Sequence, residues 1–168
     1  MSLDMYAFSL DRSEAFAKPR DVLNYRGKQD RSSLPQFVIG GPFAAERGLA
    51  DIFDTGTLLL ETDLVLPGST LLHRWCKHPD LYGWMQRRWN ALRWHKKPKQ
   101  FNAEDRVPLT VQDLDDLEHA VRHGRLPKTT GFFFGQSSGH EVADDLAFIE
   151  AARKELAAGK FVYFTSWW

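Results

Sequence analysis

The stretch EVADDLAFIEAARKELAAGKFVYFTSWW, residues 141–168, decides the fold. Its first part has acidic residues in the opening turns, basic residues near the end and Gly159 beyond them, a pattern that predicts a helix whose charges complement its dipole. Its last part, FVYFTSWW, is aromatic and β-branched and predicts a strand. A helix that leads directly into a strand indicates a domain built from layers of helix and sheet.

Four other segments predict strands, and one predicts a loop. Residues 3–10 are apolar and aromatic enough for a first strand, and FVIGGP, residues 37–42, resembles a strand stopped by glycine and proline. In TLLLETDLVLPG, residues 57–68, leucines alternate with polar residues, which predicts a half-buried strand. GFFFG, residues 131–135, predicts a short buried strand. Residues 11–36 are polar, contain proline, glycine and serine, and are expected to form a long loop.

Helices are predicted between these segments. FAAERGLADIF, residues 43–53, resembles a short helix. Ser69 or Thr70 is expected to cap a helix through residues 71–78. Pro79 then either kinks that helix or occupies the first turn of a second helix that runs to about Trp94.

The clearest helix signal follows Thr110. Thr110 and Asp113 have the spacing of a capping box, an apolar stripe follows them, and Gly124 is placed to end the helix. With strands and helices in this order, we predict a single α+β domain. Its sheet is expected to be small and mixed or antiparallel, with helices packed mainly on one face.

The composition favours a soluble protein without a global attraction to polyanions. The chain has 168 residues, 43% of them hydrophobic, and its 22 basic residues balance 22 acidic ones. Neutrality excludes a whole-surface electrostatic attraction to nucleic acid or to an anionic membrane. Cys76 is the only cysteine, so a reducing compartment suits the chain. Since no window approaches the roughly 18 apolar residues of a membrane span, we expect a cytoplasmic protein with no membrane association.

Four motifs occur in a distinctive order: LDMYAF at residues 3–8, HRWCKHPDLYGWM at 73–85, LPKTTGFFFG at 126–135 and VYFTSWW at 162–168. Together they resemble a family of small uncharacterised proteins found in bacteriophages and prophages. The resemblance implies a viral or prophage context and a shared fold, and it supplies no activity and no catalytic residue. Residues 11–70 have no counterpart in the pattern. The matching positions are Leu3, Asp4, Met5, Tyr6, Trp75, Lys77, Trp84, Leu126, Pro127, Gly131, Phe132, Phe133, Phe134, Gly135, Ser166 and Trp167.

The turn after GFFFG contains GxSxG, as Gly135, Ser137 and Gly139. A nucleophile elbow lies between a strand and a helix in the same way, but it also needs an acid and then a histidine from later loops of a large sheet. After Ser137 the chain has only one predicted helix, one predicted strand and His140, which is too close in sequence for a general-base contact. The sequence therefore argues against a serine hydrolase, and it assigns no catalytic residue.

A milder interpretation of this turn is an anion site. The two serines can cap the following helix, whose free N–H groups and dipole suit a phosphate or a carboxylate. Arg88 and Arg153 fall inside the apolar stripes of their helices, where a guanidinium needs an acceptor. They either frame one anionic pocket, or extend to the surface, or pair with an acid such as Asp145. The candidate anion-binding residues are Arg88, Arg153, Ser137, Ser138 and His140.

Residues 73–99 form a basic and tryptophan-rich segment in which Asp80 is the only acid. Interleaved rings and cations are typical of a groove for single-stranded nucleic acid. On a helical projection Trp84 and Trp89 flank the apolar stripe and are expected in the core, so only Trp94 points clearly away. We therefore favour a solvated basic face that contacts an acidic partner. The candidate interaction residues are Arg87, Arg93, Trp94, Lys96 and Lys97.

Two histidine groups contain metal-ligating residue types. One is HRWCKHPD at residues 73–80, and the other comprises Asp115, His119 and His123 along one helix face. Neither has the spacing of a known zinc motif, and no nucleotide-binding motif occurs in the sequence. We therefore expect no metal and no cofactor.

These observations favour a binding protein over an enzyme. The sequence predicts a phage-type or prophage-type accessory protein that binds a host or phage protein through residues 11–36 and the basic helical face. Two alternatives remain open: a protein or small enzyme that binds an anion or nucleotide in an arginine-lined pocket, and a protein that binds single-stranded nucleic acid. The oligomeric state is also left open.

Overall fold

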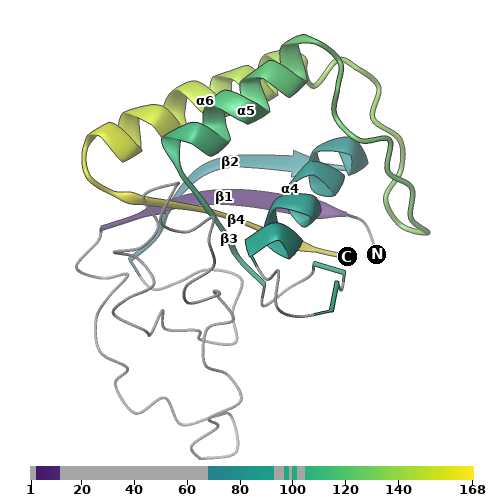
Figure 1. The fold of residues 1–168 in the computed structure, drawn as a ribbon, viewed down its shortest axis with the longest axis horizontal. Helices are drawn as coiled ribbons and strands as arrows, with labels where there is room; N and C mark the ends of the chain where they lie inside the picture. The colour runs from purple at the N-terminus through teal and green to yellow at the C-terminus, as the bar shows by residue number, and fades with distance from the viewer. Residues whose placement is uncertain (1–2, 12–67, 93–96, 99, 102–104) are drawn as a thin grey trace, which may run out of the picture.

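Two strands that are far apart in the sequence form the centre of the sheet. In a computed structural model, which describes residues 3–11, 68–92, 97–98, 100–101 and 105–168, β1 (Asp4–Leu10) pairs antiparallel with β4 (Phe161–Trp167). β2 (Thr70–Cys76) flanks β1, and β3 (Val107–Leu109) flanks β4. The sheet order is therefore β2-β1-β4-β3, with every pair antiparallel (Figure 1).

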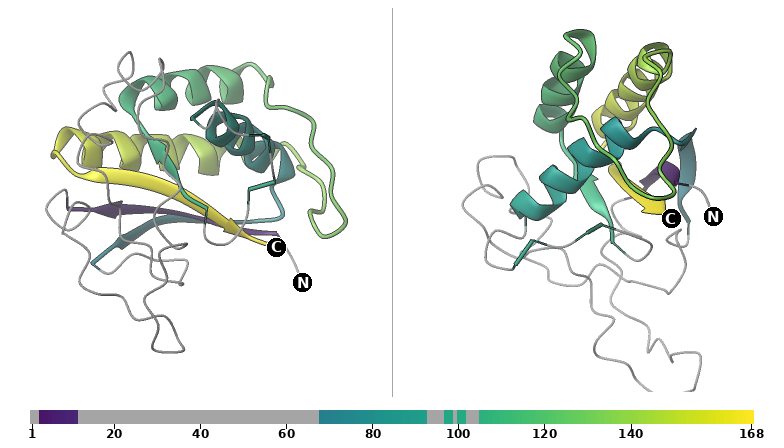
Figure 2. Two further views of the ribbon diagram at one scale, coloured as in Figure 1. Left: turned by 60° about the horizontal axis from the view of Figure 1, so that its bottom comes forward. Right: turned by 90° about the vertical axis from the view of Figure 1, so that its right-hand side faces the viewer.

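Three helices of the described residues pack on one face of this sheet. α4 (Pro79–Leu92) follows β2, whereas α5 (Val111–Arg122) and α6 (Val142–Ala157) come between β3 and β4. Apolar side chains of all three helices share one core with Met5 and Ala7 of β1, and α5 and α6 lie side by side over the strands (Figures 1 and 2). The predicted α+β class is therefore confirmed. Of the two kinds of sheet expected, mixed or antiparallel, the structure shows the antiparallel one. No helix in the described part of the chain combines the length and the apolar character that crossing a bilayer requires.

Local sequence signals set the ends of the helices. Thr110 caps α5: its Oγ1 accepts from Asp113 N at 3.2 Å, and its own N–H donates to Asp113 Oδ2 at 3.0 Å. Gly124, with φ of 60°, follows the end of α5, and Gly159, with φ of 79°, follows the end of α6. Pro79 is the first residue of α4, so of the two alternatives for this proline the structure shows the first turn of a new helix and not a kink.

Alternate residues of the central strands face opposite sides of the sheet. Val162 and Phe164 on β4 belong to the core that the helices cover. Phe161 and Tyr163 lie on the opposite face, where Tyr163 stacks on Phe8 with ring centroids 5.4 Å apart. These rings are also buried, so the centre of the sheet is shielded on both faces.

β2 corrects the prediction of a helix through residues 71–78. Residues 70–76 form a strand that pairs with β1. Trp75 is buried between Arg74 and Cys76, which are both exposed, and this alternation is that of a strand. Helix propensity is a weak preference, and pairing with β1 together with burial of the tryptophan overrides it.

The GFFFG segment corrects a second prediction, because residues 131–135 form a turn and not a buried strand. Phe134 N donates to Gly131 O at 3.2 Å, which closes the turn. Phe134 is buried against Tyr82, with ring centroids 4.7 Å apart, whereas Phe132 is 95% exposed. A run of apolar residues does not by itself fix a period, so it cannot distinguish a strand from a turn with one buried ring.

The predictions for residues 11–36, 37–42, 43–53 and 57–68 fall almost wholly on residues 12–67, which lie outside the described part of the chain.

A buried ion pair joins α4 to α5. Arg88 Nε lies 2.6 Å from Asp113 Oδ1, and the two side chains are 6% and 0% exposed. The other carboxylate oxygen, Asp113 Oδ2, accepts from Thr110, so one buried acid both caps α5 and neutralises the arginine. This pairing confirms that the inward-facing Arg88 has an acidic partner, although the partner is Asp113 and not Asp145.

We predict that Arg88→Met lowers the free energy of unfolding by about 3–5 kcal/mol, because it leaves the Asp113 carboxylate buried without its cation. Urea unfolding followed by circular dichroism measures the change. Lys154→Met is the matched control on α6, where the pair of Lys154 with Glu150 is exposed and little change is expected. Equal stability of the two variants would contradict the assignment.

Candidate functional site

The site begins at a left-handed turn between β2 and α4. Lys77, the residue that makes this turn, has φ of 58°, an uncommon conformation for a residue with a side chain. Its N–H donates to Leu3 O at 2.8 Å, which ties the turn to the start of the sheet. The turn directs the next residue, His78, into the protein, where the imidazole is 4% exposed.

A second left-handed residue, Gly135, packs against the same turn. Gly135 has φ of 73°, and a Cβ atom added to it would lie 3.0 Å from Lys77 Cβ. Glycine therefore allows the loop between α5 and α6 to approach the Lys77 turn closely. This approach places Ser137, two residues later, against the imidazole of His78.

Hydrogen bonds link Ser137, His78 and Asp145 in a chain, which we call the Ser137 site. Ser137 Oγ lies 2.8 Å from His78 Nδ1, and His78 Nε2 lies 3.0 Å from Asp145 Oδ2. The second carboxylate oxygen, Asp145 Oδ1, accepts from Trp75 Nε1 at 2.9 Å. Asp145 is 1% exposed, so the acid is held in the interior, where its two oxygens accept from Trp75 and His78.

The directions of these hydrogen bonds follow from the chemistry of the groups. An ionised Asp145 can only accept, so His78 Nε2 carries a hydrogen and donates. In a neutral imidazole the other nitrogen is then an acceptor, so the Ser137 hydroxyl donates to Nδ1. Ser137 Oγ in turn accepts from Asp80 N at 3.1 Å, in the first turn of α4. The arrangement is that of a hydroxyl beside an oriented base.

Asp80 fixes the loop that carries Ser137. Its carboxylate accepts from Thr129 N at 3.0 Å and pairs with Lys128 Nζ at 2.9 Å. The loop also lies directly on α4, because a Cβ atom added to Gly83 would be 1.9 Å from Thr129 Oγ1. The start of α4 and the loop after α5 therefore hold each other in place.

The serines of this turn do not cap α6, which corrects the expectation from the sequence. α6 begins at Val142, and Glu141 in the N-cap position makes no side-chain cap bond. Ser138 instead donates from its N–H and from its hydroxyl to the Glu141 carboxylate, at 2.8 and 2.9 Å. Ser137 serves α4, where it accepts from Asp80 N.

The Glu141 carboxyl is held in its ionised form. Burial alone would raise its pKa, but hydrogen bonds from the N–H and hydroxyl of Ser138, together with Glu141's own N–H, outweigh this and lower the pKa from 4.5 to about 2. The nearby His78 adds to the lowering of this pKa. A negative charge therefore stays next to the Ser137 site at neutral pH.

The two arginines of the predicted anion pocket are each paired with carboxylates of α5. Arg88 pairs with Asp113, and Arg153 on α6 pairs with Asp115 and Glu118. Ser137 and Ser138 lie together in the turn before α6 with His140, whose N–H donates to Ser138 Oγ at 3.3 Å. An anion at either arginine would have to displace a carboxylate that already occupies it.

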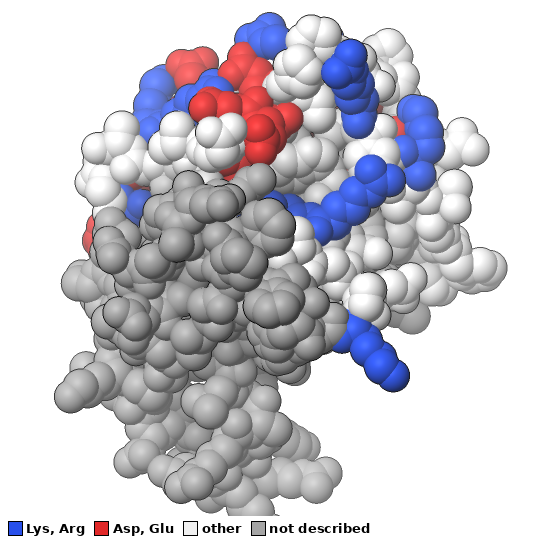
Figure 3. Space-filling model, in the orientation of Figure 1, with Lys and Arg blue, Asp and Glu red and all other residues white. Residues whose placement is uncertain are grey.

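The described residues include only part of the predicted basic surface. Arg87 and Lys97 are exposed, whereas Arg93, Trp94 and Lys96 lie outside the described residues. In Figure 3 the acidic side chains gather mainly over α5 and α6, and the charged side chains at the right of the view are mostly basic. The rings of Trp75 and Trp89 are buried, which confirms the core position expected for Trp89 and removes both rings from any stacking surface.

The two histidine groups do not assemble as metal sites in the part of the chain that is described, where no cluster of three ligating side chains occurs. His73 packs on Trp75 with ring centroids 4.4 Å apart, and His78 belongs to the Ser137 site. His119 and His123 lie side by side on α5, and His123 Nδ1 is 2.8 Å from His119 O.

Ser137 stands out in the sequence through its glycines, whereas its partners do not. An α/β-hydrolase carries its acid and then its histidine after the serine, but here His78 precedes Ser137 and Asp145 lies on the next helix. The sequence Lys77-His78-Pro79 gives a weak indication of the position of His78. A polar residue directly before a proline that starts a helix lies in the N-cap region of that helix.

Comparison of the chain with protein-family models, with curated protein sequences and with solved structures finds no match. The arrangement of the described residues is therefore the basis for any functional assignment.

We predict that the Glu141 carboxyl titrates with a pKa of about 2, against an ordinary value of 4.5. Since the folded-state pKa is lowered, its contribution to stability is complete above pH 4.5 and is lost as the pH falls to about 2. Glu141→Gln should therefore destabilise the protein at pH 7 and have little effect near pH 2, as measured by urea unfolding. Titration by NMR tests the cause, because Ser138→Ala should raise the pKa of Glu141; an unchanged pKa would contradict it.

Proposed function

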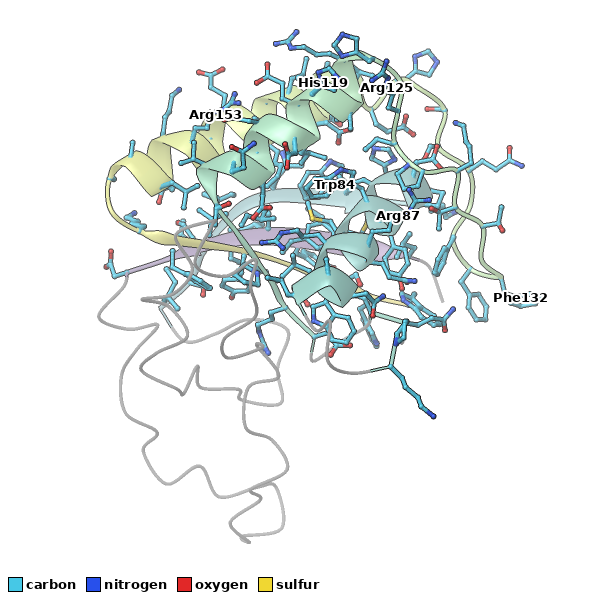
Figure 4. The ribbon with its side chains drawn as sticks, in the orientation of Figure 1. Trp84, Arg87, His119, Arg125, Phe132 and Arg153 are labelled. Atoms are coloured by element: carbon cyan, nitrogen blue, oxygen red, sulfur yellow. The ribbon has the colours of Figure 1, made fainter. Side chains whose placement is uncertain are left out.

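We propose that the protein acts by binding another protein, of host or phage origin, through the loop between α5 and α6 and the exposed cations beside it, Lys77, Arg87 and Lys128. The observation that carries the proposal is Phe132, which is 95% exposed at the far end of this loop. Figure 4 shows its side chain pointing away from the helices and the sheet. Exposed aromatic residues of this kind are common anchors of protein interfaces, because they bury a large rigid area at small entropic cost.

The base of the loop supports a preorganised anchor. Leu3 N donates to Phe133 O at 3.2 Å, and the buried Phe134 anchors the turn in the core. On the other side, Asp80 holds Lys128 and Thr129. Because these contacts fix the chain on both sides of Phe132, little conformational entropy remains to be lost when a partner binds.

The basic side chains near Phe132 favour a partner that carries acidic side chains around its binding pocket. Between residues 68 and 92 the only acid is Asp80, and it is buried and paired with Lys128. Lys77 and Arg87 are exposed in the same segment, and the Lys128 side chain is 88% exposed. The surface therefore suits an apolar pocket for Phe132 with carboxylates around it. The resemblance to phage and prophage proteins supports a partner in the infected cell.

The test uses two surface variants in parallel. Wild type, Phe132→Ser and Val111→Ser are immobilised and exposed to lysates of a bacterial host, with and without phage infection. Val111 is the matched control, since its side chain is 55% exposed at the start of α5. We expect a protein that is retained by the wild type and by Val111→Ser but is lost with Phe132→Ser.

The interaction is then measured with the purified partner by calorimetry. Phe132→Ser should raise Kd by about 30-fold or more, the loss expected for a buried aromatic anchor of about 2 kcal/mol. Arg87→Ala should weaken the salt dependence, since the rim charges act through electrostatic attraction. A partner that binds Phe132→Ser as tightly as wild type, or no partner selective for wild type, would overturn the proposal.

A further inference from the structure

The Ser137 site has no role in binding through Phe132, and its geometry points to a second activity. We infer that Ser137 is the nucleophile of an acyl-transfer site that accepts carboxylic esters, with His78 as its base and Asp145 as the residue that positions the base. The inference does not depend on the proposed partner binding, because Phe132 makes no contact in the hydrogen-bonded chain from Ser137 to Asp145.

Two buried polar groups stand behind the serine hydroxyl. The side chains of His78 and Asp145 are 4% and 1% exposed, and they form a hydrogen-bonded chain that ends at Ser137 Oγ. A serine that served only to cap α4 needs just its bond from Asp80 N. An imidazole with a buried carboxylate behind it supplies something that the cap does not require, namely an acceptor for the hydroxyl proton.

The imidazole of His78 is held in one orientation. Asp145 fixes the tautomer of His78 by accepting from Nε2, so the unprotonated Nδ1 faces Ser137 Oγ at 2.8 Å. Trp75 Nε1 holds the other carboxylate oxygen and prevents the acid from turning away. This is the relation between nucleophile, base and orienting acid that is recognised by geometry and not by the order of the residues in the sequence.

The backbone next to the serine and its base is also unusual. Lys77, which precedes His78, and Gly135, two residues before Ser137, both have positive φ and pack against each other. Conformations of this kind persist where the surrounding structure enforces them, and they concentrate at functional sites. Ser137 itself is only partly buried, whereas the base and the acid behind it are enclosed.

The reaction follows from these positions. Ser137 Oγ forms a bond to the carbonyl carbon of an ester while its proton passes to His78 Nδ1. The C–O bond to the alcohol then breaks, and the alcohol leaves with that proton. Water attacks the acyl-serine, its proton is taken by Nδ1 and returned to Oγ, and a carboxylic acid is released. The Asp80 N–H, which donates to Ser137 Oγ, holds this oxygen in position for the attack.

The experiment is active-site labelling of the full chain with a fluorophosphonate probe, with the modified peptide located by mass spectrometry. We expect labelling at Ser137 and none at Ser138, the neighbouring serine that serves as an internal control. His78→Gln should slow the labelling by about 100-fold or more, the usual contribution of a general base, while Ser138→Ala labels like wild type. The same variants should change the hydrolysis of p-nitrophenyl acetate in parallel.

A measurement on the wild type alone covers the case in which His78→Gln does not fold. Unfolding in urea should abolish the labelling of Ser137, because it separates the hydroxyl from His78. No labelling of the folded wild type, equal labelling of Ser137 and Ser138, or labelling that persists after unfolding would each overturn the inference. Phe132→Ser should label like wild type, so this outcome is separable from the test of partner binding.

Discussion

The buried carboxylate of Asp145 is the constraint on which the rest of the described structure depends. A carboxylate removed from water must be compensated by donors, and Asp145 finds them on the end of β2, in Trp75, and at the start of α4, in His78. The two bonds join α6 to the end of β2 and to the residue before α4. They therefore help to set the position of α6 over the sheet, the direction in which α4 leaves β2 and, through His78, the placement of Ser137.

A second buried acid, Asp113, also joins elements of the fold, at the other side of the helical layer. Asp113 caps α5 and neutralises Arg88 on α4, so α4 is held between two carboxylates, one near each end. Apolar packing alone tolerates small shifts between helices, whereas a buried charge tolerates few alternatives. In this protein, apolar burial gives the layers their stability, and the paired acids select how the layers fit together.

Much of the fold could be predicted from local patterns. The capping box at Thr110, the proline at the start of α4 and the charge pattern of α6 are decided within one or two turns of chain, and the structure agrees with each. The errors occur where the deciding contact is distant. Residues 70–76 are a strand because β1 lies beside them, and Phe132 is exposed because only Phe134 of its run meets Tyr82.

The candidate site shows the same limit more sharply. Ser137 was visible in the sequence through its glycines, but His78 lies directly before α4, 59 residues earlier in the chain, and Asp145 was considered only as a partner for arginine. Nothing in the spacing of His78, Ser137 and Asp145 relates them, since their proximity is created by the Lys77 turn and by Gly135. The position of Arg88 on the helical projection shows that its side chain faces inward. Nothing in the sequence indicates that its partner is Asp113.

The pairing of β1 with β4 has a consequence for how the protein forms in the cell. The two strands at the centre of the sheet are separated by almost the whole described chain, from Leu10 to Phe161. During synthesis on the ribosome, β1 therefore emerges long before β4, its partner at the centre of the sheet. The apolar face of β1 stays exposed until β4 has been made. Closing so long a loop is slow, although the added length itself costs little free energy. The order of the strands therefore delays completion of the sheet until β4 has been made.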